Sequence, residues 1–219
     1  MKVPNIIFRL IFLTAVLTVM AARVHAQPAL ERMPVPDFDE FYVASSVKLP
    51  LTKKIFIADA PVEFSERWLK DFNNMAGSHY QKMIIKKYGE ALKETLTDAL
   101  VDTGWEVVET AGENTLLLKP KLYELNIYAP NGSSLKQVIV RNVGRAIVEL
   151  DFQTPGGESF MKIVDLRATQ DTIGSPIVAN RTNNLRYFKL MMNEWSEDAV
   201  KYLDQVMKVV ESEVKSAGK

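Results

Sequence analysis

The stretch Gly144–Thr169, GRAIVELDFQTPGGESFMKIVDLRAT, decides which fold this sequence can adopt. Two runs that alternate apolar and polar residues flank the turn sequence Thr-Pro-Gly-Gly at 154–157. Alternation with a period of two is typical of strands with one buried and one solvated face, and Pro-Gly-Gly is typical of the turn between them. The stretch therefore predicts an antiparallel hairpin. Its arginines and acidic residues either do chemistry or coat a solvated face.

The register of this hairpin decides which side chains share a face, because a slip of one residue turns a whole strand over. A two-residue turn places Thr154 opposite Gly157, and a bulged alternative places Arg145 opposite Asp165. We expect the bulged register, since it separates apolar from charged residues better. Its inner face holds Val140, Gly144, Ala146, Val148, Leu150, Phe152, Phe160, Val164, Leu166 and Ala168. Its outward face holds Ile139, Val143, Ile147, Met161 and Ile163 beside Arg145 and Asp165.

Cross-strand ion pairs explain the charged residues of the outward face without chemistry, since such pairs stabilise a sheet by roughly 0.2–1 kcal/mol each. Glu149 and Asp165 could act as the paired carboxylates of a hydrolase, but the sequence indicates no pocket around them. We therefore expect no catalytic residue here. The outward face is more apolar than an exposed sheet usually is, so either the N-terminal segment or a partner protein is expected to cover it.

Two stretches carry apolar residues at helical spacing, Tyr80–Val101 and Asn184–Lys215. A shorter helical turn or a long loop is expected between Ser65 and Tyr80. Further strands are expected on both sides of the first long helix, one of them interrupted by Pro120, which cannot donate to a ladder and so indicates an edge, a bulge or a bend. Together these segments predict an α+β two-layer sandwich. Its mixed, mostly antiparallel sheet of about five strands is covered on one face by two long helices.

The N-terminal residues read as a secretory signal peptide, residues 1–26, with a basic start, an apolar run from Leu10 to Ala22 and small residues at Val24 and Ala26. The apolar run is shorter than the roughly 20 residues that a membrane-spanning helix needs. Residues 27–52 are rich in proline and are expected to form an extended N-terminal arm with little regular structure, tacked onto the domain by aromatic residues. Residues 53–219 then form a single α+β domain.

Composition limits the function further. Cleavage after Ala26 would remove Lys2, Arg9 and Arg23, so the 27 basic residues would fall to 24 against 27 acidic ones, which argues against a nucleic-acid binder. The chain has no cysteine, which excludes disulfides, thiolate metal sites and a lipid-bearing cysteine. His79 would be the one histidine of the mature chain, too few for a zinc site built from several histidines. We expect no metal and no cofactor.

Several segments resemble the domain of unknown function 3313, a family of Gram-negative envelope proteins. The matching segments are KKIFIADAPVEF, ALVDTGWEVVET, NTLLLKPKLYEL, the hairpin stretch and NEWSEDAVKYLDQ, which together span most of the predicted mature chain. The resemblance implies an envelope location and this fold, and it brings no catalytic residues. The lipid-accepting cysteine of many members is absent here, so the resemblance does not imply that this chain is tethered to a membrane.

We therefore expect an exported periplasmic protein of the bacterial cell envelope, soluble or peripherally attached, that acts as a non-enzymatic interaction or accessory module with an envelope protein as its partner. The alternative is a small-ligand-binding protein or hydrolase with its site around His79 and the loop from Trp68 to Tyr80, near the segment IGSPIVANRTNN at 173–184. A purely structural role is compatible with the same residues.

Overall fold

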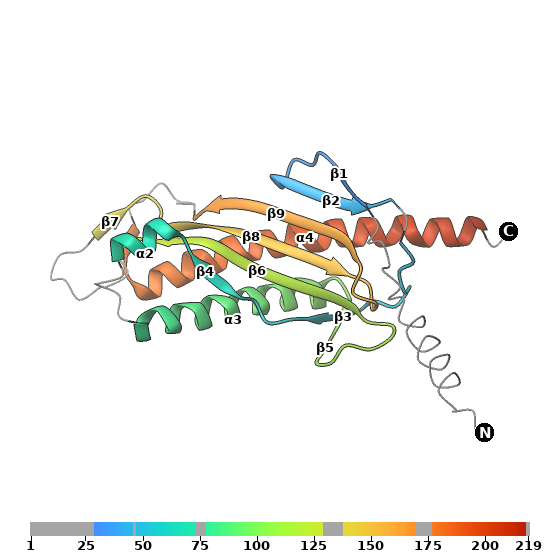
Figure 1. Cartoon of the computed structure of the whole chain (residues 1–219), viewed down its shortest axis with the longest axis horizontal. Coiled ribbons are helices and arrows are strands. Elements are labelled where there is room, and N and C mark those ends of the chain that lie inside the picture. Colours follow the sequence, from blue (N-terminus) through green and yellow to red (C-terminus); the bar gives the residue numbers. More distant parts are fainter. Residues whose placement is uncertain (1–28, 46, 73–77, 129–137, 170–176, 218–219) are drawn as a thin grey trace, which may run out of the picture.

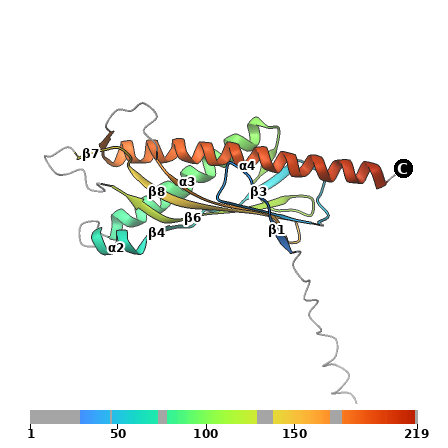
Figure 2. The same cartoon turned by 90° about the horizontal axis from the view of Figure 1, so that it is seen from above.

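The computed structural model describes residues 29–45, 47–72, 78–128, 138–169 and 177–217. The predicted signal peptide lies outside these residues. The described chain has the predicted α+β class: one large mixed sheet carries two long helices side by side on one face (Figure 1). Figure 1 looks onto the other, open face of the sheet, and Figure 2 shows the same layers from the side.

The large sheet has eight strands instead of about five, in the order β1-β2-β9-β8-β6-β3-β5, with β4 beside β6. The pairs from β1 to β6 are antiparallel, whereas β3 runs parallel to both β5 and β6. The strands are β1 Leu30–Arg32, β2 Glu40–Ala44, β3 Lys54–Ile57, β4 Val62–Phe64, β5 Glu106–Val108, β6 Leu116–Ile127, β8 Gly144–Gln153 and β9 Ser159–Ala168. A separate two-stranded sheet pairs β7 Val138–Val140 with β10 Ile177–Ala179.

Two of the additional strands belong to the N-terminal arm. β2 pairs antiparallel with β9, and β1 folds back on β2, so the arm extends the sheet at the edge of β9. Phe38 and Phe41 are buried there, each with its ring within 6 Å of the ring of Tyr202. The arm is thus docked through aromatic residues, and the prediction of little regular structure missed both of its strands.

The two long helices occur where the apolar spacing predicts them. They are α3 Ser78–Asp102 and α4 Arg181–Ala217, and a short helix, α2 Glu66–Phe72, occupies the stretch expected to be a helical turn or a loop. Leu92, Leu96 and Trp195 are fully buried between the helices and the sheet. Burying each large apolar side chain stabilises the fold by about 1.5–3 kcal/mol, so this layer supplies most of the driving force.

Pro120 lies in the middle of the long strand β6, at a break in the neighbouring strand. β3 pairs with β6 up to Leu118, and β4 begins to pair at Leu122. Between them the chain makes only two bonds that flank the proline: Ala58 N–H donates to Leu118 O at 2.9 Å, and Leu122 N–H donates to Pro61 O at 3.0 Å. The position that lacks a donor therefore lies at a local edge of the sheet, where the neighbouring strand is interrupted; an edge was one of the three alternatives that the sequence indicated.

The hairpin register differs from both predicted registers. Thr154 N–H donates to Glu158 O at 2.8 Å and Gly157 N–H donates to Thr154 O at 2.9 Å, which closes a three-residue turn over Pro155–Gly157. Gly157 takes the left-handed conformation that such a turn needs, with φ of 83°. A further irregularity after Phe152 then places Arg145 opposite Ala168 and Val148 opposite Asp165.

This register reverses the predicted faces of β9 while keeping those of β8. Met161, Ile163 and Asp165 point toward the helices, and Leu166 is 45% exposed on the open face. The prediction that Arg145 faces Asp165 was wrong, and so was the burial of Val164, Leu166 and Ala168 against the helices. The physical reason is the irregularity after Phe152: the three-residue turn alone would leave the faces of β9 as predicted, and one further residue turns the whole strand over.

The strand breaks just before Gly144, so residues 138–153 do not form one continuous strand. Gly144 has φ of 154°, and a Cβ built there would lie 2.0 Å from Asn126 O and 2.9 Å from the ring of Phe188 on α4. Only glycine lets α4 approach the sheet this closely. The chain N-terminal to this point, β7, leaves the large sheet and pairs with β10.

We predict that Gly144→Ala lowers the free energy of unfolding by about 3 kcal/mol or more, because it combines backbone strain with overlap against backbone and ring atoms. Chemical denaturation measures the loss. Gly156→Ala is the control, since its Cβ would meet only the Thr154 hydroxyl at 3.5 Å. Equal losses in the two variants would contradict the close approach of α4 at Gly144.

Candidate functional site

The residues predicted to form one partner-binding face are divided among three places. Ile139 is 62% exposed on β7, outside the large sheet, and Arg145 and Ile147 lie on the open face. The other four are buried, three of them fully: Val143, Met161, Ile163 and, at 5% exposure, Asp165. The seven residues therefore do not form one accessible surface. The side chains of Met161, Ile163 and Asp165 face the helices, on the opposite side of the sheet from the one predicted.

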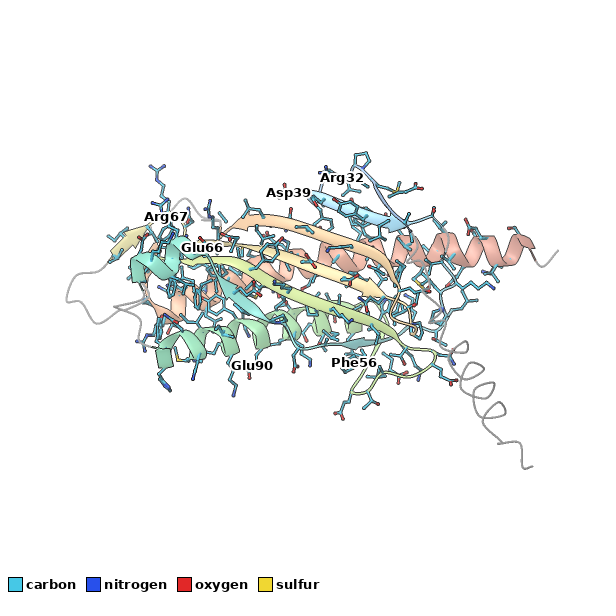
Figure 3. The ribbon with its side chains drawn as sticks, viewed as in Figure 1. Arg32, Asp39, Phe56, Glu66, Arg67 and Glu90 are labelled. Carbon is cyan, nitrogen blue, oxygen red and sulfur yellow. The ribbon has the colours of Figure 1, made fainter. Side chains whose placement is uncertain are left out.

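Asp165 instead lies at the centre of a buried polar group, called here the Asp165 cluster. Its carboxylate accepts three hydrogen bonds: from Asp39 N–H at 3.0 Å, from Arg167 Nε at 2.7 Å and from Trp195 Nε1 at 2.7 Å. Asp39 makes a second contact with β9, because its carboxylate accepts a hydrogen bond from Leu166 N–H at 2.9 Å. The cluster joins the arm, β9 and α4, and Figure 3 places the labelled Asp39 and Arg32 at this edge of the sheet.

Arg167 and Asp37 complete the Asp165 cluster. The guanidinium of Arg167 donates to Asp37 O at 2.9 Å and to Asp198 Oδ2 at 3.0 Å. Burial opposes its charge, but the bonds to Asp198 and Asp165 outweigh burial and raise the pKa of Arg167. Bonds from Lys201 and Tyr202 lower the pKa of Asp37 below its ordinary value. Since each of these charges has partners, the cluster is structural, and we assign it no reaction.

The open face keeps the mixed character that the sequence indicated; Ile147 and Arg145 remain on it, while the other residues differ from those predicted. Glu149 and Lys162 form an ion pair at 3.0 Å in its centre, each side chain about one third exposed. Apolar and aromatic side chains surround this pair, contributed by β2, β6, β8 and β9. They are Tyr42, Tyr123, Ile147, Val164 and Leu166. The arm does not cover this face, because it extends the edge of the sheet.

A groove lies on the other side of the sheet, between the arm and the C-terminal half of α4. This arm–helix groove has a volume of about 400 Å³ and is lined mostly by aliphatic and aromatic side chains. Met33 on the arm and Val209 on α4 are 51% and 57% exposed, so the groove opens to solvent. Beyond it, the last turns of α4 run past the ends of the strands (Figure 1).

A second hollow, the α3–α4 cavity, lies between the N-terminal halves of the two long helices and has a volume of about 690 Å³. Tyr80 and Thr182, from the two segments of the predicted His79 site, line it. His79 does not line the cavity and is exposed on the first turn of α3. Residues 73–77 and 173–176 of the predicted site lie outside the described residues.

Metal-binding side chains do not cluster in the part of the chain that the structure describes: no group of three or more His, Asp or Glu side chains is placed to hold an ion there. Within the same residues, no helix combines the length and the apolar character that crossing a membrane requires.

Comparison with known proteins identifies no family. No protein-family model matches the chain, and no curated protein matches it. Among solved structures, a minor lipoprotein from Acinetobacter baumannii has 10% identity and a TM-score of 0.37, covering 70% of this chain and 93% of that one. A PelC dodecamer from Paraburkholderia phytofirmans has 9% identity and a TM-score of 0.36, covering 72% and 96%. The resemblance to the domain of unknown function 3313 stays a prediction.

Sequence reasoning missed the Asp165 cluster, although one signal for it was present. Asp165 and Arg167 follow Met161 and Ile163 at a spacing of two, so all four share a face in any register. If Met161 and Ile163 are assigned to the core, Asp165 and Arg167 are expected on the same buried face. Such a pair needs buried partners, and Trp195 supplies an indole N–H.

We predict that Asp165→Asn lowers the free energy of unfolding by about 3 kcal/mol, because it leaves Arg167 buried without its carboxylate and disturbs two further donors. Amide exchange of Glu40–Ala44 should rise at the same time, because the arm loses its link to β9. Glu149→Gln is the control and should cost less than about 1 kcal/mol, since its ion pair is partly exposed. Unchanged protection of β2 in Asp165→Asn would contradict the role of the cluster.

Proposed function

We propose that this protein is an exported, non-enzymatic interaction module of the bacterial cell envelope that binds an apolar segment of a partner protein in the arm–helix groove. The observation that carries the proposal is the apolar lining of this groove together with the exposure of Met33 and Val209. Apolar side chains that form a continuous, solvent-open depression favour association, because burying each one fully yields about 1.5–3 kcal/mol.

The composition of the groove resembles that of a protein interface, with an apolar centre and a polar rim. Phe41, Val43 and Phe160 form its floor from the sheet, and Tyr202 closes one side from α4. Gln205 and Glu213 of α4 provide polar groups at the same site. Interfaces of this kind bind through a few large apolar anchors from the partner, which fill the depression while the rim stays hydrated.

The groove also has rigid walls. Its floor belongs to β2 and β9, which are held together by their ladder and by the Asp165 cluster, and its wall is the long helix α4. Preformed walls reduce the conformational entropy that binding costs, which favours recognition without folding of the site.

We predict that Val209→Asp abolishes capture of the partner without unfolding the protein, because Val209 is 57% exposed and its replacement places a charge in the apolar groove. The tagged protein is crosslinked in the periplasm, purified, and its partners are quantified by mass spectrometry. A partner recovered with the wild type should fall at least about tenfold with the variant, the loss expected from one desolvated charge.

Val101→Asp is the matched control, since Val101 is 54% exposed on α3 and does not line the groove. It should capture the partner as the wild type does. Ile147→Asp tests the open face, the location favoured by the sequence, and should also leave capture intact. Loss with Ile147→Asp and not with Val209→Asp would move the interface to the open face. Equal capture by all variants, or recovery of no partner at all, would contradict the proposal.

A further inference from the structure

Two side chains that line the α3–α4 cavity each have a polar atom that forms no hydrogen bond among the described residues. Asn184 is 1% exposed; its Nδ2 donates to Tyr128 O at 2.9 Å, while its Oδ1 has no hydrogen-bond partner among the described residues. The bond to a carbonyl settles the orientation of the amide, because only the nitrogen can donate. Native structures satisfy nearly all buried polar atoms, so a free acceptor beside a cavity points to a ligand that donates to it.

Tyr88 is the second such residue. It lines the same cavity, is 4% exposed, and packs its ring against Phe188 at 5.0 Å between centroids. Its hydroxyl makes no hydrogen bond within the described part of the chain, and unlike Asn184 Oδ1 it is not a fully enclosed atom, so it is accessible from the cavity. Burial raises the pKa of Tyr88, so the hydroxyl remains protonated and able to donate.

The mouth of the cavity carries positive charge. Lys87, Arg181, Arg186 and Lys189 line it, and no Asp or Glu is among its described lining residues. Lys189 is paired with Glu94 at 2.6 Å, and the guanidinium of Arg181 lies 4.3 Å from the ring centre of Tyr80. Lys87 and Arg186 are exposed and form no ion pair with any residue that the structure describes. An anion placed between them would be attracted by uncompensated charges.

We propose that the α3–α4 cavity binds a small hydroxylated organic anion. Its phosphate or carboxylate lies between Lys87 and Arg186, a hydroxyl donates to Asn184 Oδ1 and accepts from Tyr88, and its carbon skeleton packs on Ile84 and Leu185. The volume of about 690 Å³ lies within the range of 300–1,000 Å³ usual for ligand sites. This site is separate from the arm–helix groove and does not depend on the function proposed for it.

Isothermal titration of the purified protein tests the ligand class with matched probes. Glycerol 3-phosphate and gluconate carry both an anionic group and hydroxyls; methyl phosphate and acetate carry the anionic group alone, and glycerol the hydroxyls alone. We expect at least one of the first pair to bind with a dissociation constant below about 1 mM, and its hydroxyl-free counterpart to bind about tenfold more weakly. A preference for the phosphate or for the carboxylate identifies the anionic group. Failure of both hydroxylated anions to bind would overturn the proposal.

Variants then locate the site. Lys87→Ala and Arg186→Ala should each weaken binding about tenfold, whereas Lys82→Ala and His79→Ala, exposed changes on α3 outside the cavity, should not. Tyr88→Phe keeps the ring and should weaken the hydroxylated anion about fivefold while leaving its hydroxyl-free counterpart unchanged. Thermal unfolding confirms that each variant is folded. Equal weakening by Lys82→Ala and Lys87→Ala would indicate general attraction to a basic surface and overturn the assignment.

Discussion

The carboxylate of Asp165 is the constraint on which the rest of the structure depends. A charge this far from solvent needs partners. It accepts hydrogen bonds from Arg167 in its own strand and from two segments distant in sequence, through Asp39 in the arm and Trp195 in α4. Any other register of β9 would place Asp165 elsewhere and leave Trp195 Nε1 without its acceptor. The arm, the hairpin and the long helix are therefore held in one arrangement by a single side chain and its partners.

The long helix α4 is held at a second point. Phe188 packs on Gly144 at a place where no side chain fits, and Trp195, two turns later, donates to Asp165. A hollow of about 470 Å³ lies beside the middle of α4, against α3. The α3–α4 cavity lies toward the N-terminal end of α4 and the arm–helix groove toward its C-terminal half. One helix thus carries a basic, partly polar site and an apolar one.

Particular residues show how far the sequence could be interpreted. The apolar spacing of Tyr80–Val101 and Asn184–Lys215 predicted both long helices, because a stripe with a 3.6-residue period can be buried in only one way. Pro120 indicated an edge, a bulge or a bend, because its missing donor is a local property. The register of the hairpin could not be derived, since Thr-Pro-Gly-Gly is compatible with turns of two or three residues and no residue type marks the irregularity after Phe152, which decides the face of Met161 and Asp165.

The sequence by itself determined the two long helices, the two strands that flank the Thr-Pro-Gly-Gly turn, and that helices and strands together form an α+β fold. These properties depend on the periodicity of neighbouring residues and on the conformational limits of glycine and proline. Only the tertiary structure decided which charged residues are buried, that the arm extends the sheet instead of covering it, and that Asn184 and Tyr88 line one cavity. Those outcomes depend on side chains far apart in the sequence that share a volume only after the chain has folded, and on whether each buried polar atom then finds a partner.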